Sequence, residues 1–123
     1  MKIIVTGALG HIGSKLIRDL PDSFEQLSIV MVDDLSTQRY CSLFDLPKTA
    51  TYSFFEGKVN EMPWDDILQD VDAVIHLAAL TDAAGTADRP DVVHQNNFES
   101  TKTVADACLK ANVALIFPSS TSV

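Results

Sequence analysis

Cysteine is scarce in this sequence, and the placement of the few cysteines excludes common cysteine-based sites. The chain has only two, Cys41 and Cys108, which are far apart and form no C-x-x-C pair. A C-x-x-C redox or metal motif is therefore absent. We expect two free thiols in a reducing, cytoplasmic compartment.

Histidine is almost as rare, and its spacing does not favour a metal site. His11, His76 and His94 show no His-x-x-x-His pattern and no acidic partner pattern. Zinc sites need ligands at such short, regular spacings. We therefore predict no metal site. His76, at the end of an apolar run, is predicted to be a hydrogen-bonded structural residue.

Positive charge and long apolar runs are also lacking. Nine Lys and Arg residues are outnumbered by 17 Asp and Glu residues, the formal net charge is −8, and the basic residues form no cluster. Such a chain would repel a polyanionic nucleic acid. No apolar run approaches the ~20 residues of a membrane-spanning helix. The first residues favour a strand over a signal peptide. We expect neither nucleic acid nor membrane as a partner.

The remaining pattern alternates strands and helices along 123 residues, which fit a single domain over residues 1–123. Apolar, β-branched runs predict strands at 2–6, 27–32, 51–55, 73–77 and 113–117. Helices are predicted at 12–20, where Pro21 should end the helix, and at 63–68 and 89–112. The run at 73–77 is expected to be buried on both faces. This alternation predicts an α/β fold with a doubly wound parallel sheet in the order 3-2-1-4-5.

Three glycines follow the first predicted strand directly. Gly7, Gly10 and Gly13 are spaced Gly-x-x-Gly-x-x-Gly and lead into the first predicted helix. A helix N-terminus offers unpaired N–H groups and the positive end of its dipole, so it can hold a phosphate without a basic side chain. The glycines suit a sharp turn, close approach of a ligand, and tight packing of helix on strand. The pattern indicates a nucleotide site.

An acidic residue narrows the prediction from a nucleotide site to a dinucleotide site. Asp33 ends the second predicted strand, 20 positions after Gly13, and Asp34 follows it. A carboxylate there can accept hydrogen bonds from the adenosine ribose and would repel a 2′-phosphate, which favours NAD over NADP. Arg39 could instead meet a phosphate, a weaker alternative. The Gly-Lys-[Ser/Thr] ending of a P-loop is absent, which argues against an ATPase.

Several motifs now occur in one order. They are the glycine turn at 6–13, Val-Asp-Asp-Leu-Ser at 32–36, His-Leu-Ala-Ala at 76–79, the Asn pair at 96–97, and Pro-Ser-Ser-Thr-Ser-Val at 118–123. Together they resemble the extended short-chain dehydrogenases/reductases, specifically the NAD-dependent epimerase/dehydratase family that acts on nucleotide sugars. The resemblance covers the whole chain. It implies a Rossmann fold, which is incomplete here relative to the family.

The resemblance also implies roles for individual residues. The pyrophosphate would be surrounded by Gly7, Gly10, His11, Ile12 and Gly13. The adenosine would be met by Asp33, Asp34, Leu35, Ser36, Lys58 and Val59. The path toward the nicotinamide would be lined by Leu77, Ala78, Ala79 and Thr81, with Asn97 nearby on the long helix. Ser120 matches the catalytic Ser/Thr, which hydrogen-bonds the reacting group of the substrate.

Two departures from the family pattern stand out. Lys58 occupies a position where the family commonly has an acid, and a lysine cannot accept a bond from the adenine amine. The catalytic Tyr-x-x-x-Lys pair is also absent, since neither Tyr40 nor Tyr52 is followed by Lys four positions later. We therefore interpret the chain as the N-terminal, cofactor-binding part of a longer enzyme, inactive alone.

Two functional hypotheses follow. The first is the NAD-binding part of a nucleotide-sugar epimerase or dehydratase, which transfers a hydride between a sugar carbon and nicotinamide. Its complete form would take a nucleotide-sugar substrate and could be a homodimer. The alternative is a non-catalytic dinucleotide-binding or sensor module. A Tyr-x-x-x-Lys motif a few tens of residues past Val123 would favour the enzyme.

Overall fold

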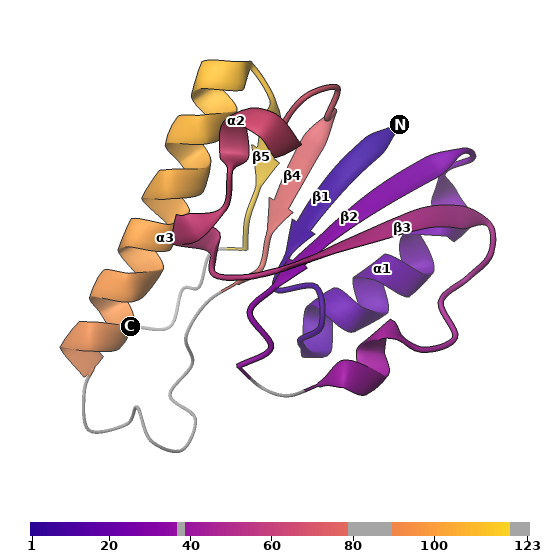
Figure 1. The fold of residues 1–123 in the computed structure, drawn as a ribbon, viewed down its shortest axis with the longest axis horizontal. Helices are drawn as coiled ribbons and strands as arrows, with labels where there is room; N and C mark the ends of the chain where they lie inside the picture. Colours follow the sequence, from indigo (N-terminus) through magenta and orange to yellow (C-terminus); the bar gives the residue numbers. More distant parts are fainter. Residues whose placement is uncertain (37–38, 79–89, 119–123) are drawn as a thin grey trace.

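The strands form one parallel sheet in a computed structural model that describes residues 1–36, 39–78 and 90–118. The strand order is β3-β2-β1-β4-β5, and every neighbouring pair runs parallel (Figure 1). The sheet is wound outward from β1 in both directions, which places a change of winding direction between β1 and β4. The predicted doubly wound α/β fold and its strand order are confirmed.

The elements lie close to their predicted positions. The strands are β1 (Lys2–Thr6), β2 (Leu27–Asp33), β3 (Ala50–Glu56), β4 (Ala73–His76) and β5 (Ala114–Ile116). The α-helices are α1 (His11–Ser23), α2 (Trp64–Ile67) and α3 (Pro90–Ala111). Two short 3₁₀ helices are η1 (Tyr40–Leu43) and η2 (Val59–Glu61). Apart from the end of α1, each predicted boundary lies within one residue of the observed one.

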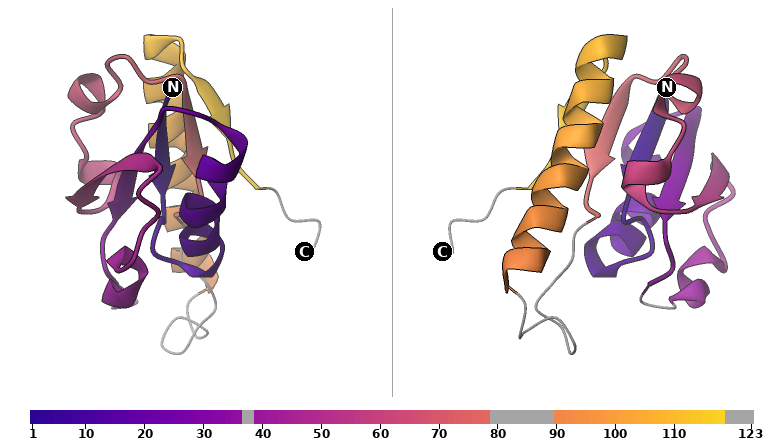
Figure 2. Two further views of the ribbon diagram at one scale, coloured as in Figure 1. Left: turned by 90° about the vertical axis from the view of Figure 1, so that its right-hand side faces the viewer. Right: turned by 60° about the vertical axis from the view of Figure 1, so that its left-hand side comes forward.

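The core consists of two apolar layers, one on each face of the sheet. Helix α1 lies on one side and α3 on the other (Figure 2). Successive residues of a strand point to opposite faces, so Ile3 and Val5 pack with Ile17 of α1, whereas Ile4 packs with Val104 of α3. β1 is therefore buried from both sides, and its carboxyl end is held firmly in the middle of the sheet.

The prediction that Pro21 ends the first helix is wrong, because α1 continues through it to Ser23. A proline in a helix provides no N–H for the carbonyl four residues earlier, which here is that of Ile17. The hydroxyl of Tyr52 in β3 donates a hydrogen bond to this carbonyl. The strand thus replaces the missing helical donor, and the helix can extend by one further turn.

The expectation that the run at 73–77 is buried on both faces is also wrong. In β4, Val74 and His76 are buried, but Ala73 and Ile75 are only half-buried. Ile75 is paired with Ile116 of β5, which is 57% exposed. Within the described ranges, α1 covers the sheet around β1 and β2 and leaves this face open at β4 and β5 (Figure 2). No helix among the described residues is long and apolar enough to cross a bilayer.

Candidate functional site

The carboxyl ends of β1, β2 and β4 meet at the first glycine of the turn. Gly7 has φ +66°, and its N–H donates to the Val32 carbonyl at 2.8 Å. A Cβ at this position would come within 2.7 Å of the Ala78 nitrogen. Gly7 is therefore required both by its left-handed backbone and by the closeness of β4.

The other two glycines differ in what surrounds them. A Cβ on Gly13 would overlap the carbonyl oxygen of Gly7 and lie 2.9 Å from backbone atoms of Ala8. Gly13 therefore allows α1 to pack directly on the turn. A Cβ on Gly10 would meet nothing closer than 3.4 Å. The turn does not itself require a glycine at position 10, so this side is open for the close approach of a ligand.

The N-terminus of α1 presents unused hydrogen-bond donors. Within the described part of the chain, no hydrogen bond engages the N–H groups of His11, Ile12 or Gly13, and the N-cap residue Gly10 has no side chain that could cap them. No acidic residue lies in the first turn of the helix. Together with the helix dipole, these donors can hold an anion. Their arrangement agrees with the predicted pyrophosphate site.

Asp33 connects the glycine turn to the end of β2. Its Oδ2 accepts the N–H of Leu9 at 3.1 Å, and its Oδ1 accepts the N–H of Leu35 at 2.8 Å. Leu35 has φ +60°, an uncommon conformation that this second bond helps to hold. A carboxylate can accept about four hydrogen bonds, so both oxygens of Asp33 retain capacity for ribose hydroxyls.

The other predicted adenosine residues lie around Asp33. Asp34 is exposed, and its Oδ1 accepts the N–H of Ser36 at 2.9 Å. The N–H of Gly57 donates to the Asp33 carbonyl at 3.0 Å, which brings the end of β3 to the same edge. Lys58 follows with an exposed side chain, whereas Val59 is 8% exposed and packs in the core. Val59 can therefore meet a ligand mainly through its backbone.

The path along β4 is organised by a residue that sequence reasoning missed. Thr6 Oγ1 accepts the N–H groups of Leu77 at 3.0 Å and of Ala78 at 3.1 Å. The same oxygen lies 2.6 Å from Nδ1 of His76. Because the lone pairs of this oxygen face two N–H donors, we assign its hydroxyl proton to the hydrogen bond with Nδ1, which accepts it. His76 is therefore assigned as the neutral tautomer that carries its proton on Nε2. Thr6 thus fixes Leu77 and Ala78, two of the residues that were predicted to lie toward the nicotinamide.

His76 is the hydrogen-bonded structural residue that was predicted. It is 4% exposed, and burial lowers the pKa of its imidazole. Its Nε2 is buried and has no hydrogen-bond partner among the described residues. Burial therefore favours the neutral ring in the folded protein.

Arg39 lies beside the turn, where the sequence left open a contact with a phosphate. Its Nε donates to the Leu9 carbonyl at 3.1 Å, and one terminal nitrogen lies 3.3 and 3.2 Å from Nδ1 and Nε2 of His11. Part of the guanidinium is thus engaged by the protein itself.

Not every predicted site residue can be placed. Ala79, Thr81 and Ser120 lie outside the described residues. Asn97 is half-buried on α3.

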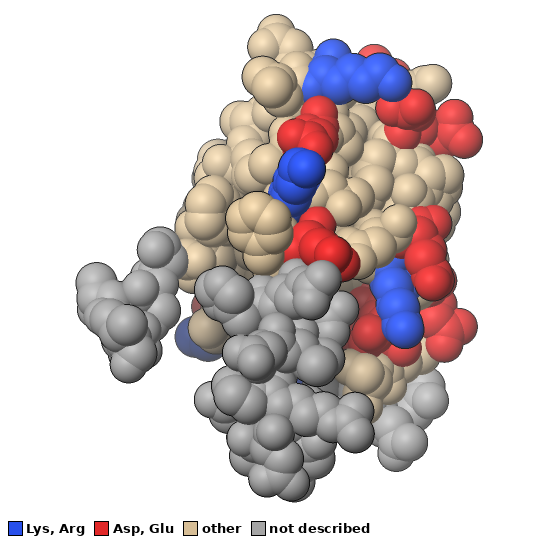
Figure 3. Space-filling model, turned by 90° about the vertical axis from the view of Figure 1, so that its left-hand side faces the viewer, with Lys and Arg blue, Asp and Glu red and all other residues tan. Residues whose placement is uncertain are grey.

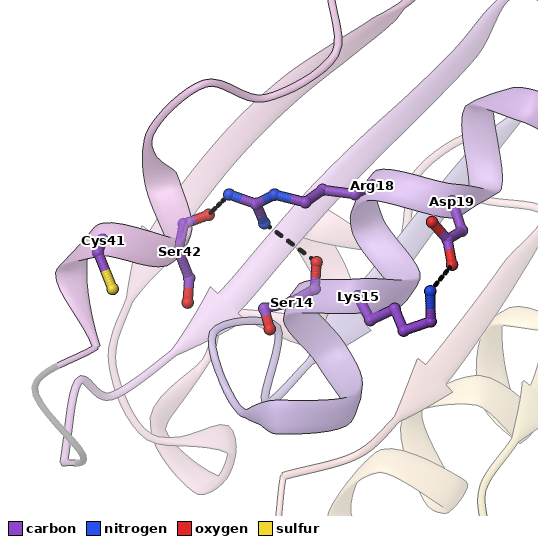
Figure 4. Close-up of a pocket in the computed structure, with 6 residues that line it drawn as sticks. All are labelled: Ser14, Lys15, Arg18, Asp19, Cys41 and Ser42. Atoms are coloured by element: carbon purple, nitrogen blue, oxygen red, sulfur yellow. Dashed lines mark hydrogen bonds and ion pairs between the residues drawn. The ribbon is translucent and has the colours of Figure 1, made fainter.

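A shallow hollow of about 380 Å³ lies between α1 and η1, and none of the predicted ligand residues lines it (Figure 4). Arg18 in its wall donates to the carbonyls of Ser14 and Ser42, both at 3.0 Å, and Lys15 is paired with Asp19 at 2.8 Å. On the face of the molecule formed by α3, acidic and basic side chains alternate with uncharged ones (Figure 3).

A parallel sheet in this order, with an anion cradle after β1 and a carboxylate at the end of β2, defines a dinucleotide-binding domain. Comparison with known proteins narrows this class. The chain belongs to the NAD dependent epimerase/dehydratase family, whose family model matches residues 3–123. The family resemblance identified in the sequence is confirmed, and NAD is the cofactor on which this family depends.

Individual relatives agree with this membership. The chain is 30% identical to a UDP-glucose 4-epimerase from Azospirillum brasilense over 98% of its own length and 34% of the relative. A UDP-N-acetylglucosamine 4-epimerase from Methanobrevibacter ruminantium M1 is 31% identical, with a TM-score of 0.84, over 99% of this chain and 38% of that one. A UDP-glucose-4-epimerase from Stenotrophomonas maltophila with bound NAD is 26% identical, with a TM-score of 0.84. This match covers 100% of the present chain and 38% of the epimerase. The chain thus spans little more than a third of these relatives.

Proposed function

We propose that this chain is the NAD-binding part of a nucleotide-sugar epimerase or dehydratase. The observation that carries the proposal is the set of free N–H groups at His11, Ile12 and Gly13, with the Asp33 carboxylate next to the same turn. The donors suit a pyrophosphate, and the carboxylate suits the ribose beside it. The open space at Gly10 allows a ligand to reach the backbone.

The preference for NAD over NADP rests on charge. Asp33 and the exposed Asp34 would repel a 2′-phosphate, whereas a 2′-hydroxyl can donate to Asp33. Lys58 lies at the same edge, where it can donate to an acceptor atom of the adenine but cannot accept from its amine. Leu77 and Ala78, held by Thr6, would line the way to the nicotinamide. Ala79, Thr81 and Asn97 extend this path in the proposal.

Catalysis is proposed for the complete protein. When bound, NAD supplies a hydride acceptor and donor for a sugar carbon. Ser120 would hydrogen-bond the reacting hydroxyl or carbonyl, and a Tyr-x-x-x-Lys pair would move its proton. The relatives' names support a uridine diphosphate sugar as the substrate class. The homodimer predicted for the complete protein can be checked by light scattering.

Calorimetric titration with NAD and NADP tests the cofactor proposal. We expect Asp33→Asn to weaken NAD binding by about ten- to a hundredfold, because it removes charge-assisted hydrogen bonds. The same change should narrow the difference between NAD and NADP. Asp22→Asn, at the far end of α1, is the matched control. Equal affinity of the unaltered protein for both cofactors would contradict the proposal.

A second candidate is a non-catalytic dinucleotide-binding module, which would use the same fold without the Tyr-x-x-x-Lys chemistry. Both candidates bind NAD, so binding alone does not separate them. The coding sequence past Val123 separates the two candidates. A Tyr-x-x-x-Lys motif within a few tens of codons supports the enzyme, and a stop codon or an unrelated sequence supports the module.

A further inference from the structure

We propose that Ser42 is a positioning residue for the phosphate-binding turn, and that Arg39 assists it. Both side chains hold the carbonyl of Leu9, so that this oxygen is directed toward η1 and away from the donors at the start of α1. The inference rests on the proposed function, because it concerns how the same site binds phosphate.

The side chain of Ser42 is buried and reaches the turn across a long stretch of sequence. Ser42 is 5% exposed, and its Oγ donates to the Leu9 carbonyl at 3.1 Å. The Nε of Arg39 donates to the same oxygen, also at 3.1 Å. One carbonyl in the glycine turn therefore receives two side-chain donors from the segment around η1.

The peptide groups on either side of Leu9 are fixed as well. Its N–H donates to Asp33 Oδ2 at 3.1 Å, and the N–H of Gly10 donates to the Gly7 carbonyl at 3.1 Å. Gly10 has no Cβ to resist rotation of the peptide that precedes it. If that peptide rotated, the carbonyl oxygen of Leu9 could turn toward a bound phosphate and repel it. The donors from Ser42 and Arg39 oppose this rotation.

Helix α1 in turn fixes the η1 segment. Arg18 donates to the carbonyls of Ser42 at 3.0 Å and of Phe44 at 2.8 Å, and also to that of Ser14 in its own helix at 3.0 Å. Figure 4 shows the Arg18 side chain extending from α1 to Ser42. Because the segment is anchored to the helix whose N-terminus holds the phosphate, the turn and the helix keep one relative position.

Arg39 adds a second contact at the site. One terminal nitrogen is almost equally far from both ring nitrogens of His11, at 3.2 and 3.3 Å. A donor in the plane of the ring at such distances from both nitrogens would collide with the carbon between them, so this terminal nitrogen lies over the ring face. This contact holds the first residue of α1, whose N–H is one of the three free donors.

The experiment compares the binding of ADP with that of adenosine, each measured by titration on the full chain. Adenosine reports the ribose and base contacts, and the ratio of the two affinities reports the phosphate contribution. We expect Ser42→Ala to lower this ratio by about tenfold, the effect of one lost hydrogen bond of typical strength. Ser42→Thr, which keeps the hydroxyl, should restore most of the ratio. Ser53→Ala, on the exposed side of β3, is the matched control.

Arg39→Lys provides a second route if Ser42→Ala folds poorly, because it keeps the charge and loses the planar contacts to Leu9 and His11. We expect it to lower the ratio by about threefold. An unchanged ratio in both variants overturns the positioning role. If the unaltered chain binds neither ADP nor NAD, the proposed function itself fails, so the two failures are distinguishable.

Discussion

Strands β2 and β5 are both apolar, yet they are covered to different extents. In β2, Ile29 and Val32 are fully buried on opposite faces, whereas in β5 Ile116 is 57% exposed. The glycine turn follows β1, and Asp33 ends β2. Strand β5, which is open on one face among the described residues, precedes Ser120 in the sequence. The comparison shows that the proposed cofactor cradle follows the two strands, β1 and β2, that are packed from both sides.

The largest expected effect tests this difference directly. Ile29→Ala should lower the free energy of unfolding by about 2 to 5 kcal/mol, because it removes fully buried methyl and methylene groups. Ile116→Ala should lower it by less than about 1 kcal/mol, since more than half of that side chain already contacts water. Chemical denaturation of both variants measures the two values. Equal losses would show that β2 and β5 do not differ in packing.

A second pair of changes separates stability from binding within the turn. Gly13→Ala should cost about 2 kcal/mol of unfolding free energy, because the new Cβ overlaps the Gly7 carbonyl and nearby backbone. Gly10→Ala should change stability by less than about 0.5 kcal/mol. It should nevertheless weaken NAD binding, since its Cβ would occupy the open side of the turn. Chemical denaturation measures the stability of both variants, and calorimetry measures their NAD binding. A destabilised Gly10→Ala protein would contradict the prediction.

The smallest effect concerns pH and the middle of the sheet. Burial lowers the pKa of His76 in the folded protein below that in the unfolded chain. Unfolding therefore takes up a proton as the pH falls through the unfolded value of about 6.5, and stability is lost in that direction. The stability of a His76→Asn variant should fall less between pH 7.5 and pH 5 than that of the unaltered protein. Parallel curves for the two proteins would exclude a contribution from His76.

The predictable parts of this molecule are those that depend on local patterns. Apolar runs located all five strands, and the spacing of the glycines located the turn and the start of α1. Asp33 was singled out because it ends a strand at a characteristic distance from Gly13, and the structure places its carboxylate against the turn. Each of these signals is contained in a short window of sequence or in a fixed spacing.

The parts that could not be predicted depend on contacts between distant residues. Pro21 is a helix breaker by local rules, and its acceptance depends on Tyr52, which lies in another element. Ser42 is in no motif, and its partner Leu9 is 33 residues away. The role of Thr6 becomes visible only when β1 and β4 lie side by side, 70 residues apart in the chain.

The two hydrogen bonds of Asp33 have a consequence for redesigning cofactor preference. The carboxylate that would select the ribose also receives the N–H of Leu9, so it is a structural part of the turn as well as a candidate contact for the cofactor. An engineer who exchanged Asp33 for a small residue to admit a 2′-phosphate would also leave that N–H without an acceptor. A productive switch to NADP must therefore supply a new acceptor for Leu9 together with the new cation.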